Sequence, residues 1–157
     1  MPEKIAPAPP LAVAWLGYGG LAPFVLLAAA AHLDSSPTGP WAGLLLAYGA
    51  VILSFVGALH WGVAMVVPQT GHGQGSAWFG WSVVPSLLGW LALGLLQFGM
   101  AGAAGWTLLA GFVAHYRMDL RLVRQAPLPG WYLPLRLRLT VVACLCIAAV
   151  AGAGGST

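Results

Sequence analysis

The sequence has very few charged residues. Only 6 Lys or Arg and 3 Asp or Glu residues occur among 157, or 6% of the chain, whereas about a quarter of the residues in a soluble domain are charged. Hydrophobic residues make up 60%, and the mean hydropathy is +0.87. So few charges cannot cover a core of this size with a water-facing surface, so much of the apolar surface must face lipid. The composition excludes a soluble domain and predicts an integral membrane protein.

Other features are also scarce. Cys144 and Cys146 lie two residues apart in an apolar run, where their side chains would point about 200° apart around a helix, which excludes a disulfide or a shared metal ion. The net charge is +3, but the sequence has no polar face on which basic residues alternate with aromatic ones. This excludes a nucleic-acid binder. No acidic residue falls within a long apolar stretch, so we expect no proton-relay carboxylate of the kind that pumps use.

Five stretches meet or approach the length of about 20 mainly apolar residues that a membrane-spanning helix requires. The fourth is the shortest. The continuous run over residues 78–116 is too long for one helix and predicts a helical hairpin with a tight turn within residues 99–105. We predict an all-α integral membrane bundle, a single transmembrane domain over residues 1–157 with five transmembrane helices, at approximately 11–31, 41–67, 78–97, 102–116 and 137–153.

The positions of the cations predict the orientation, because Lys and Arg near the ends of spans stay on the cytoplasmic side. Lys4 precedes the first span, and the other five cations lie within residues 117–138, between the fourth and fifth spans or at the start of the fifth. Five spans place both groups on the same side, whereas four would not. We therefore predict a multi-pass protein of the bacterial inner membrane with a cytoplasmic N-terminus and an outer C-terminus.

We expect residues 117–136 to form an inner loop that begins as an amphipathic extension of the fourth helix. Three arginines with helical spacing would attract anionic lipid headgroups from this extension: Arg117, Arg121 and Arg124.

The first span has two further features. Gly19, Gly20 and Pro23 predict a kink, because proline lacks a backbone donor and glycine lacks a stiffening side chain. Small residues at 28–31 resemble a signal-peptidase site, but the apolar region before them has about 20 residues, longer than the 7–15 of a signal peptide. We expect the span to be retained.

His60 and His115 are the histidines inside the predicted spans, which makes them functional candidates. Each lies about six residues, or about 9 Å, to the cytoplasmic side of its span centre, so the two share a depth. The same arithmetic brings Trp15, Ser82 and Thr140 to about this level and predicts one polar layer in the inner half of the bundle. Small residues accompany polar ones on the helix faces, as is typical of helix contacts.

Several interpretations of His60 and His115 stay open. The two imidazoles could ligate the iron of haem b or another metal, or they could form a quinone pocket together with Trp61 and Ser86. Alternatively, they are packed histidines that donate to Ser82, Ser86 or a carbonyl. We predict no catalytic residue and no separate metal site. The candidate cofactor-binding residues are His60, His115, Trp61, Ser82 and Ser86.

The segment YGAVILSFVGALHWG at residues 48–62, followed by WSVVPSLLGW at 81–90, resembles a small bacterial inner-membrane family of unknown function with mitochondrial transmembrane relatives. The first span's LGYGGLAPF and the RLRLT of residues 136–140 are similar to its remaining motifs. The resemblance covers nearly the whole chain and implies a link with respiratory membranes, but no reaction. It implies that the family motifs include Ser54, His60, Trp61, Pro85 and Ser86.

Two hypotheses for the function follow. The leading one is a non-enzymatic accessory or assembly subunit that packs against other integral membrane proteins through its small-residue faces, because acids, nucleophile dyads and soluble domains are missing. The alternative is a haem- or quinone-binding membrane protein that uses His60 and His115. A passive channel would need a continuous polar path, which only the inner half of the bundle offers.

Overall fold

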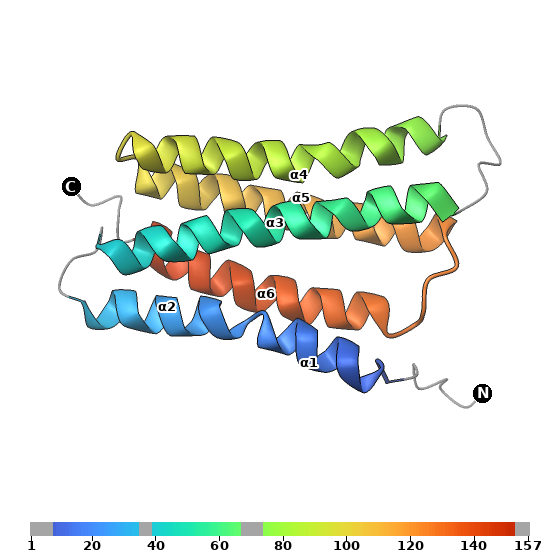
Figure 1. Cartoon of the computed structure of the whole chain (residues 1–157), viewed down its shortest axis with the longest axis horizontal. Helices are drawn as coiled ribbons and strands as arrows, with labels where there is room; N and C mark the ends of the chain where they lie inside the picture. The colour runs from blue at the N-terminus through green and yellow to red at the C-terminus, as the bar shows by residue number, and fades with distance from the viewer. Residues whose placement is uncertain (1–7, 35–38, 67–73, 153–157) are drawn as a thin grey trace.

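A computed structural model of the chain describes residues 8–34, 39–66 and 74–152. Lys4 and His72 lie outside these residues. The described chain is helical and contains no strand (Figure 1). Its elements are α1 (Leu11–Gly19), α2 (Ala22–Leu33), α3 (Pro40–Val66), α4 (Gln74–Gln97), α5 (Ala101–Gln125) and α6 (Tyr132–Ala151).

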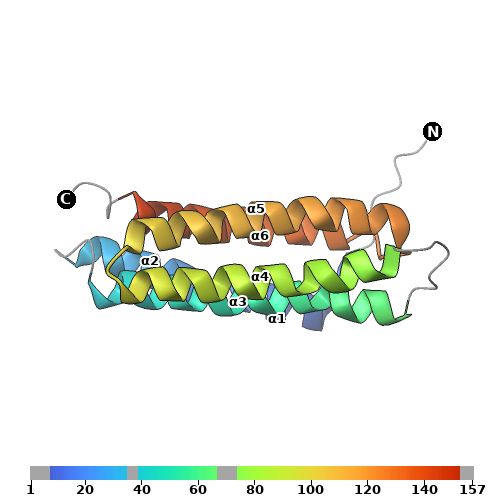
Figure 2. The same cartoon turned by 90° about the horizontal axis from the view of Figure 1, so that it is seen from above.

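The helices run side by side along one long axis and form a helical membrane bundle. α3 packs against α4, α4 against α5, and α5 against α6, while α2 lies against α3 and α6. Seen from above, α5 and α6 lie along one side of the bundle, and α3 and α4 lie along the opposite side (Figure 2). α1 begins at one end of the bundle and α6 finishes at the other (Figure 1). The chain is thus a multi-pass membrane protein built from antiparallel helices.

Four helical stretches in the described chain are long and apolar enough to cross a membrane: Leu11–Leu33, Pro40–Val66, Ala77–Gln97 and Tyr132–Ala151. α5 does not meet this criterion, although it runs alongside the others (Figures 1 and 2). The reason is in its sequence, since its second half carries Arg117, Asp119, Arg121 and Arg124.

The predicted kink in the first span is confirmed. α1 ends at Gly19 and α2 begins at Ala22, with Pro23 in the first turn of α2, where its missing N–H is not needed. The break exposes the carbonyl of Gly20, which accepts a hydrogen bond of 2.9 Å from the Tyr48 hydroxyl of α3. The partner helix thus satisfies a backbone group that the break releases from the helix ladder.

The predicted hairpin between the third and fourth spans is also confirmed, but its turn is shorter than expected. Gly99 has a φ of 74°, and its N–H and that of Met100 donate to the carbonyls of Leu96 and Leu95. This is the glycine-dependent closure of a helix end, because residues with a Cβ rarely adopt positive φ. α5 begins at Ala101, so Gly105 lies inside a helix rather than in the turn.

Glycines set the close approach between helices inside the bundle. A Cβ added at Gly57 of α3 would lie 2.9 Å from the Cβ of Pro85 in α4, and one at Gly89 of α4 would lie 2.9 Å from the carbonyl oxygen of Ala50. The expectation that small residues mark helix contacts is therefore correct for these two positions. The contacts are internal to the chain.

Candidate functional site

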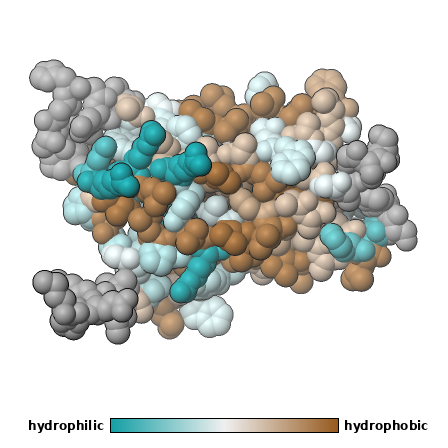
Figure 3. Space-filling view, turned by 180° about the vertical axis from the view of Figure 1, so that it is seen from behind, coloured by the Kyte–Doolittle hydropathy of each residue, from teal (hydrophilic) through white to brown (hydrophobic). Residues whose placement is uncertain are grey.

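The inward face of α5 carries the centre of the site. His115 and Asp119 are one helical turn apart and both fully buried, and Leu122 follows on the same face. Arg117, Arg121 and Arg124 lie on the opposite, exposed face. Figure 3 shows hydrophilic side chains gathered toward one end of the molecule, beyond a hydrophobic middle. α5 is amphipathic at this end, and its buried face includes an acid.

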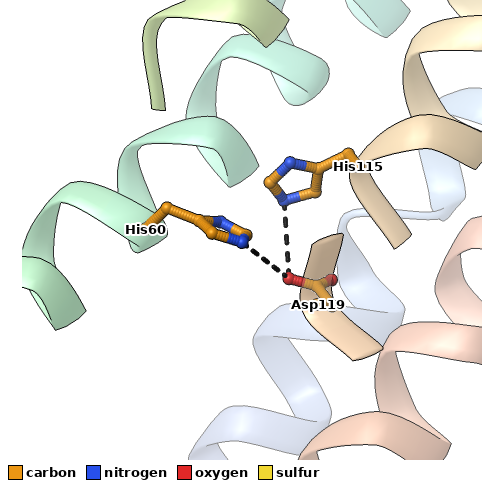
Figure 4. A group of neighbouring side chains, drawn as sticks. All are labelled: His60, His115 and Asp119. Carbon is orange, nitrogen blue, oxygen red and sulfur yellow. Dashed lines mark ion pairs between the residues drawn. The ribbon is translucent and has the colours of Figure 1, made fainter. Parts of the chain in front are cut away.

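α3 brings the second histidine to the same place. The rings of His60 and His115 are 4.7 Å apart between centroids and meet edge to face. The Nε2 atoms of both rings lie 3.7 Å from the same carboxylate oxygen, Oδ1 of Asp119 (Figure 4). Trp78 of α4 lies beside the His60 ring, at 5.6 Å between centroids. Three helices thus enclose one cluster, whose core is His60, His115 and Asp119.

α6 supplies the groups that hold the carboxylate. The Nε of Arg136 donates to Oδ2 of Asp119 at 2.8 Å, and the Tyr132 hydroxyl donates to Oδ1 at 3.0 Å. Arg136 is 8% exposed and Asp119 is fully buried, so a buried ion pair joins α5 to α6. Such a pair balances two charges that would each be costly in an apolar interior.

The two imidazoles have no hydrogen-bond partner. All four ring nitrogens of His60 and His115 are buried without one, which is unusual because buried polar groups are almost always paired. The backbones of Met118 and Val56 lie near the His60 and His115 rings, respectively, but outside hydrogen-bond geometry. The cluster therefore has unused donor and acceptor capacity at the point where its side chains converge.

The structure brings only some of the sequence-predicted site residues together. It brings His60 and His115 together, as their common depth suggests. Trp61 is 45% exposed, and its ring meets that of Phe79 edge to face at 5.0 Å between centroids rather than a ring of the cluster.

The serines do not partner the histidines either. The hydroxyl of buried Ser82 donates to the Phe79 carbonyl at 2.6 Å, and half-buried Ser86 makes no hydrogen bond with either imidazole. Of the other residues assigned to the predicted polar layer, Trp15 is 73% exposed and does not point into the bundle, whereas Thr140 is buried and lines a cavity together with Arg136.

The predicted amphipathic extension of the fourth helix through Arg124 is confirmed, because α5 runs to Gln125. The loop assignment is wrong for residues 132–136, which belong to α6, and two functional candidates, Asp119 and Arg136, were missed. Asp119 lies in α5, and Arg136 lies in α6, which begins five residues earlier than the predicted fifth span. The sequence placed Asp119 outside the predicted spans and did not predict its burial, which Arg136 makes possible by neutralising the carboxylate. The spacing from His115 to Asp119 and Leu122, opposite the arginines, is the signal that could have identified it.

Comparisons with known proteins place the chain in a family. The family model described as Protein of unknown function (DUF3429) matches residues 9–152. Transmembrane protein 69 of Xenopus tropicalis is 40% identical over 147 residues, which cover 89% of this chain and 52% of that protein. The chain thus spans about half the length of this relative. No solved structure matches the chain. The family match over most of the chain and this level of identity show that the chain belongs to the DUF3429 family of membrane proteins of unknown function.

Proposed function

We propose that this protein binds a divalent first-row transition metal ion inside the membrane, through His60, His115 and Asp119. The observation that supports the proposal most strongly is the convergence of two unpartnered imidazole Nε2 atoms on one carboxylate oxygen, each at 3.7 Å. Donor and acceptor would form a direct hydrogen bond at about 2.9 Å. A spacing of 3.7 Å is too long for that bond and suits two ligands on either side of a small cation.

The distances agree with metal coordination. Bonds of about 2.1 Å to a tetrahedral ion place neighbouring ligand atoms about 3.4 Å apart. One ligand atom from each of the three residues lies within 4.8 Å of the others, so closure requires inward movements of about 1 Å at most. Imidazole and carboxylate together suit zinc, iron or copper better than magnesium or calcium. A bound ion would supply a Lewis-acidic centre with at least one coordination position left open.

α6 fits the role of a supporting shell. Tyr132 and Arg136 both donate to Asp119, and such outer hydrogen bonds orient metal ligands and hold them in place. Because Arg136 neutralises the carboxylate, the cluster is uncharged when the imidazoles are neutral.

Haem fits this cluster poorly. Two imidazoles on opposite sides of one iron, with bonds of about 2.1 Å, hold their ring centres about 6 Å apart. Those of His60 and His115 are 4.7 Å apart, and both rings face the same carboxylate oxygen. Both side chains are also fully buried against neighbouring helices. A single ion is the better occupant.

The test is metal binding by the purified protein in detergent. After chelator treatment, Co²⁺ is titrated while its visible absorption is recorded, and elemental analysis gives the metal content per chain. We expect about one ion per chain, and more than about 100-fold weaker binding in His60→Gln and His115→Gln. His32→Gln is the matched control, because His32 is exposed on α2. Wild-type protein without bound metal, or equal binding by His115→Gln and His32→Gln, would overturn the proposal.

We further propose that α5 completes a fifth crossing and that the protein lies in the bacterial inner membrane with its N-terminus in the cytoplasm. α1 begins at one end of the bundle and α6 finishes at the opposite end (Figure 1). This arrangement supports an odd number of crossings. The exposed arginines of α5 and α6 support the orientation. Alkaline phosphatase fused after Ala151 should be active, and fused after Leu128 inactive. The reverse pattern would exclude this topology.

Contact with anionic lipid headgroups is part of the same proposal. Arg117, Arg121 and Arg124 are exposed on one face of α5, and of these Arg121 has a contact of 3.7 Å to the sulfur of Met118. Replacing all three by Gln should lower the anionic lipid retained per chain after purification, with zwitterionic lipid unchanged. Equal retention of both would argue against the contact.

An accessory or assembly role is a second candidate, supported by glycines that face outward. Gly43 and Gly62 of α3 and Gly80 and Gly94 of α4 have open space where a Cβ would lie, so another helix could approach them closely. The inward glycines already contact helices of the same chain and are not available to a partner. Purification at native expression in mild detergent tests this role, and repeated recovery of the isolated chain alone would count against it.

A further inference from the structure

A second candidate site adjoins the cluster on its other side. A cavity of about 370 Å³ lies between α1, α2, α3 and α6, next to the break between α1 and α2. Its volume falls within the range of about 300 to 1,000 Å³ of small-molecule sites. Most of its lining is apolar and includes Val13, Phe24, Ile52, Leu139 and Ala143. Neither Trp61 nor Ser86 is part of it.

The polar end of this cavity has donors without acceptors. Arg136 lines the cavity together with Tyr132, but only its Nε is hydrogen-bonded, to Asp119. Its two Nη nitrogens lie near the Tyr132 hydroxyl, and in the part of the chain that the structure describes they make no hydrogen bond of good geometry. Unpaired N–H groups of a guanidinium are costly in an apolar environment. An occupant of the cavity that offers an acceptor would remove this cost.

The charge balance indicates which kind of acceptor fits. Asp119 already neutralises Arg136, and the Tyr132 hydroxyl is engaged with the same carboxylate. A phosphate would have to bury its charge among the apolar side chains that make up most of the lining, whereas a carbonyl oxygen accepts from Arg136 without carrying charge into them. The occupant is therefore a neutral carbonyl compound with a large apolar body.

We propose that the cavity binds an isoprenoid quinone, whose ring carbonyl accepts hydrogen bonds from the Nη groups of Arg136 and whose tail follows the apolar lining toward α2. The cavity is already open on its outer side, because the strongly exposed side chains of Leu16 and Phe55 form part of its lining. The quinone pocket thus lies beside Arg136 rather than beside Trp61. It is a different site from the metal cluster, although Arg136 borders both.

The test compares two equal substitutions in the α1–α2 unit. Val13→Phe fills the cavity from its half-buried α1 wall, without changing Arg136 or the metal ligands. Val25→Phe adds the same volume at a position that is 49% exposed and outside the cavity lining. Each protein is purified from quinone-containing bacterial membranes, checked for monodispersity, and extracted for quinone and phospholipid. The thermal midpoint is then measured with a benzoquinone that carries a ten-carbon chain.

We expect quinone to co-purify with wild-type protein and Val25→Phe, and at least about tenfold less with Val13→Phe. The added benzoquinone should raise the thermal midpoint of the first two proteins only. Equal quinone content and equal midpoint shifts in Val13→Phe and Val25→Phe would overturn the proposal, as would recovery of phospholipid alone with no shift in any protein. Metal content distinguishes this result from the metal proposal, because Val13→Phe should retain its ion in either case.

Discussion

The contact between α3 and α4 at Gly89 allows a quantitative prediction. In Gly89→Ala the new methyl group would lie 2.9 Å from the carbonyl oxygen of Ala50 and 3.1 Å from the Oγ of Ser54. These two atoms are themselves hydrogen-bonded at 2.9 Å, so neither can move away freely. The helices must separate by a few tenths of an ångström, and overpacking of this kind costs about 1 to 3 kcal/mol.

Gly94→Ala on the same helix isolates this cost. A Cβ at Gly94 meets nothing within 4 Å. Both substitutions gain about 1 kcal/mol of helix propensity, so this gain cancels and the difference in stability between the two variants equals the overpacking cost. For a chain of this size, 1 kcal/mol corresponds to about 2 to 4 °C. Gly89→Ala should therefore unfold about 2 to 12 °C below Gly94→Ala.

The measurement is the thermal midpoint of both variants and the wild-type protein in one detergent, from the loss of the monodisperse chromatographic peak. Gly94→Ala should equal or exceed the wild type. If Gly89→Ala is as stable as Gly94→Ala, the two helices are not as close at this position as described, and the packing argument fails.

Three further predictions concern the polar contacts. Asp119→Asn leaves Arg136 buried without its counter-charge and should cost about 3 to 5 kcal/mol; adding Arg136→Gln should recover part of this loss of thermal stability, and strictly additive losses would contradict the pairing. Tyr132→Phe removes one hydrogen bond to Asp119 and should weaken Co²⁺ binding about 10- to 100-fold, an effect that an unchanged titration would refute. Tyr48→Phe leaves the Gly20 carbonyl without its donor and should cost about 1 kcal/mol, visible as a fall in thermal midpoint of a few degrees.

The features that follow from short sequence separations could be predicted. Gly19, Gly20 and Pro23 act on their own helix, so the kink could be placed before the structure was known. The depth of His60 and His115 follows from counting residues along two helices, and the structure brings these rings to 4.7 Å. The direction in which each ring faces depends on helix rotation, which hydropathy defines only loosely when nearly every face is apolar.

Asp119 and Arg136 could not be placed in this way because each is acceptable in the bundle only with the other. They lie 17 positions apart, on separate helices. When each charge is considered alone, both residues fall in the predicted inner loop of residues 117–136. For the same reason the fourth predicted span ends at residue 116. The pair became visible only when the packing of α5 against α6 was known.

The same ion pair bears on the order in which the chain is assembled. α5 is not apolar enough to cross a membrane by itself, and its carboxylate is synthesised before the guanidinium that neutralises it. Until α6 emerges, the proposed crossing of α5 depends on its short turn to α4 at Gly99 and on its packing against α3 and α4. On the proposed topology, insertion of the last helix is therefore the step that completes the crossing of α5, and a chain that stops before Tyr132 should expose α5 to the quality-control proteases of the membrane.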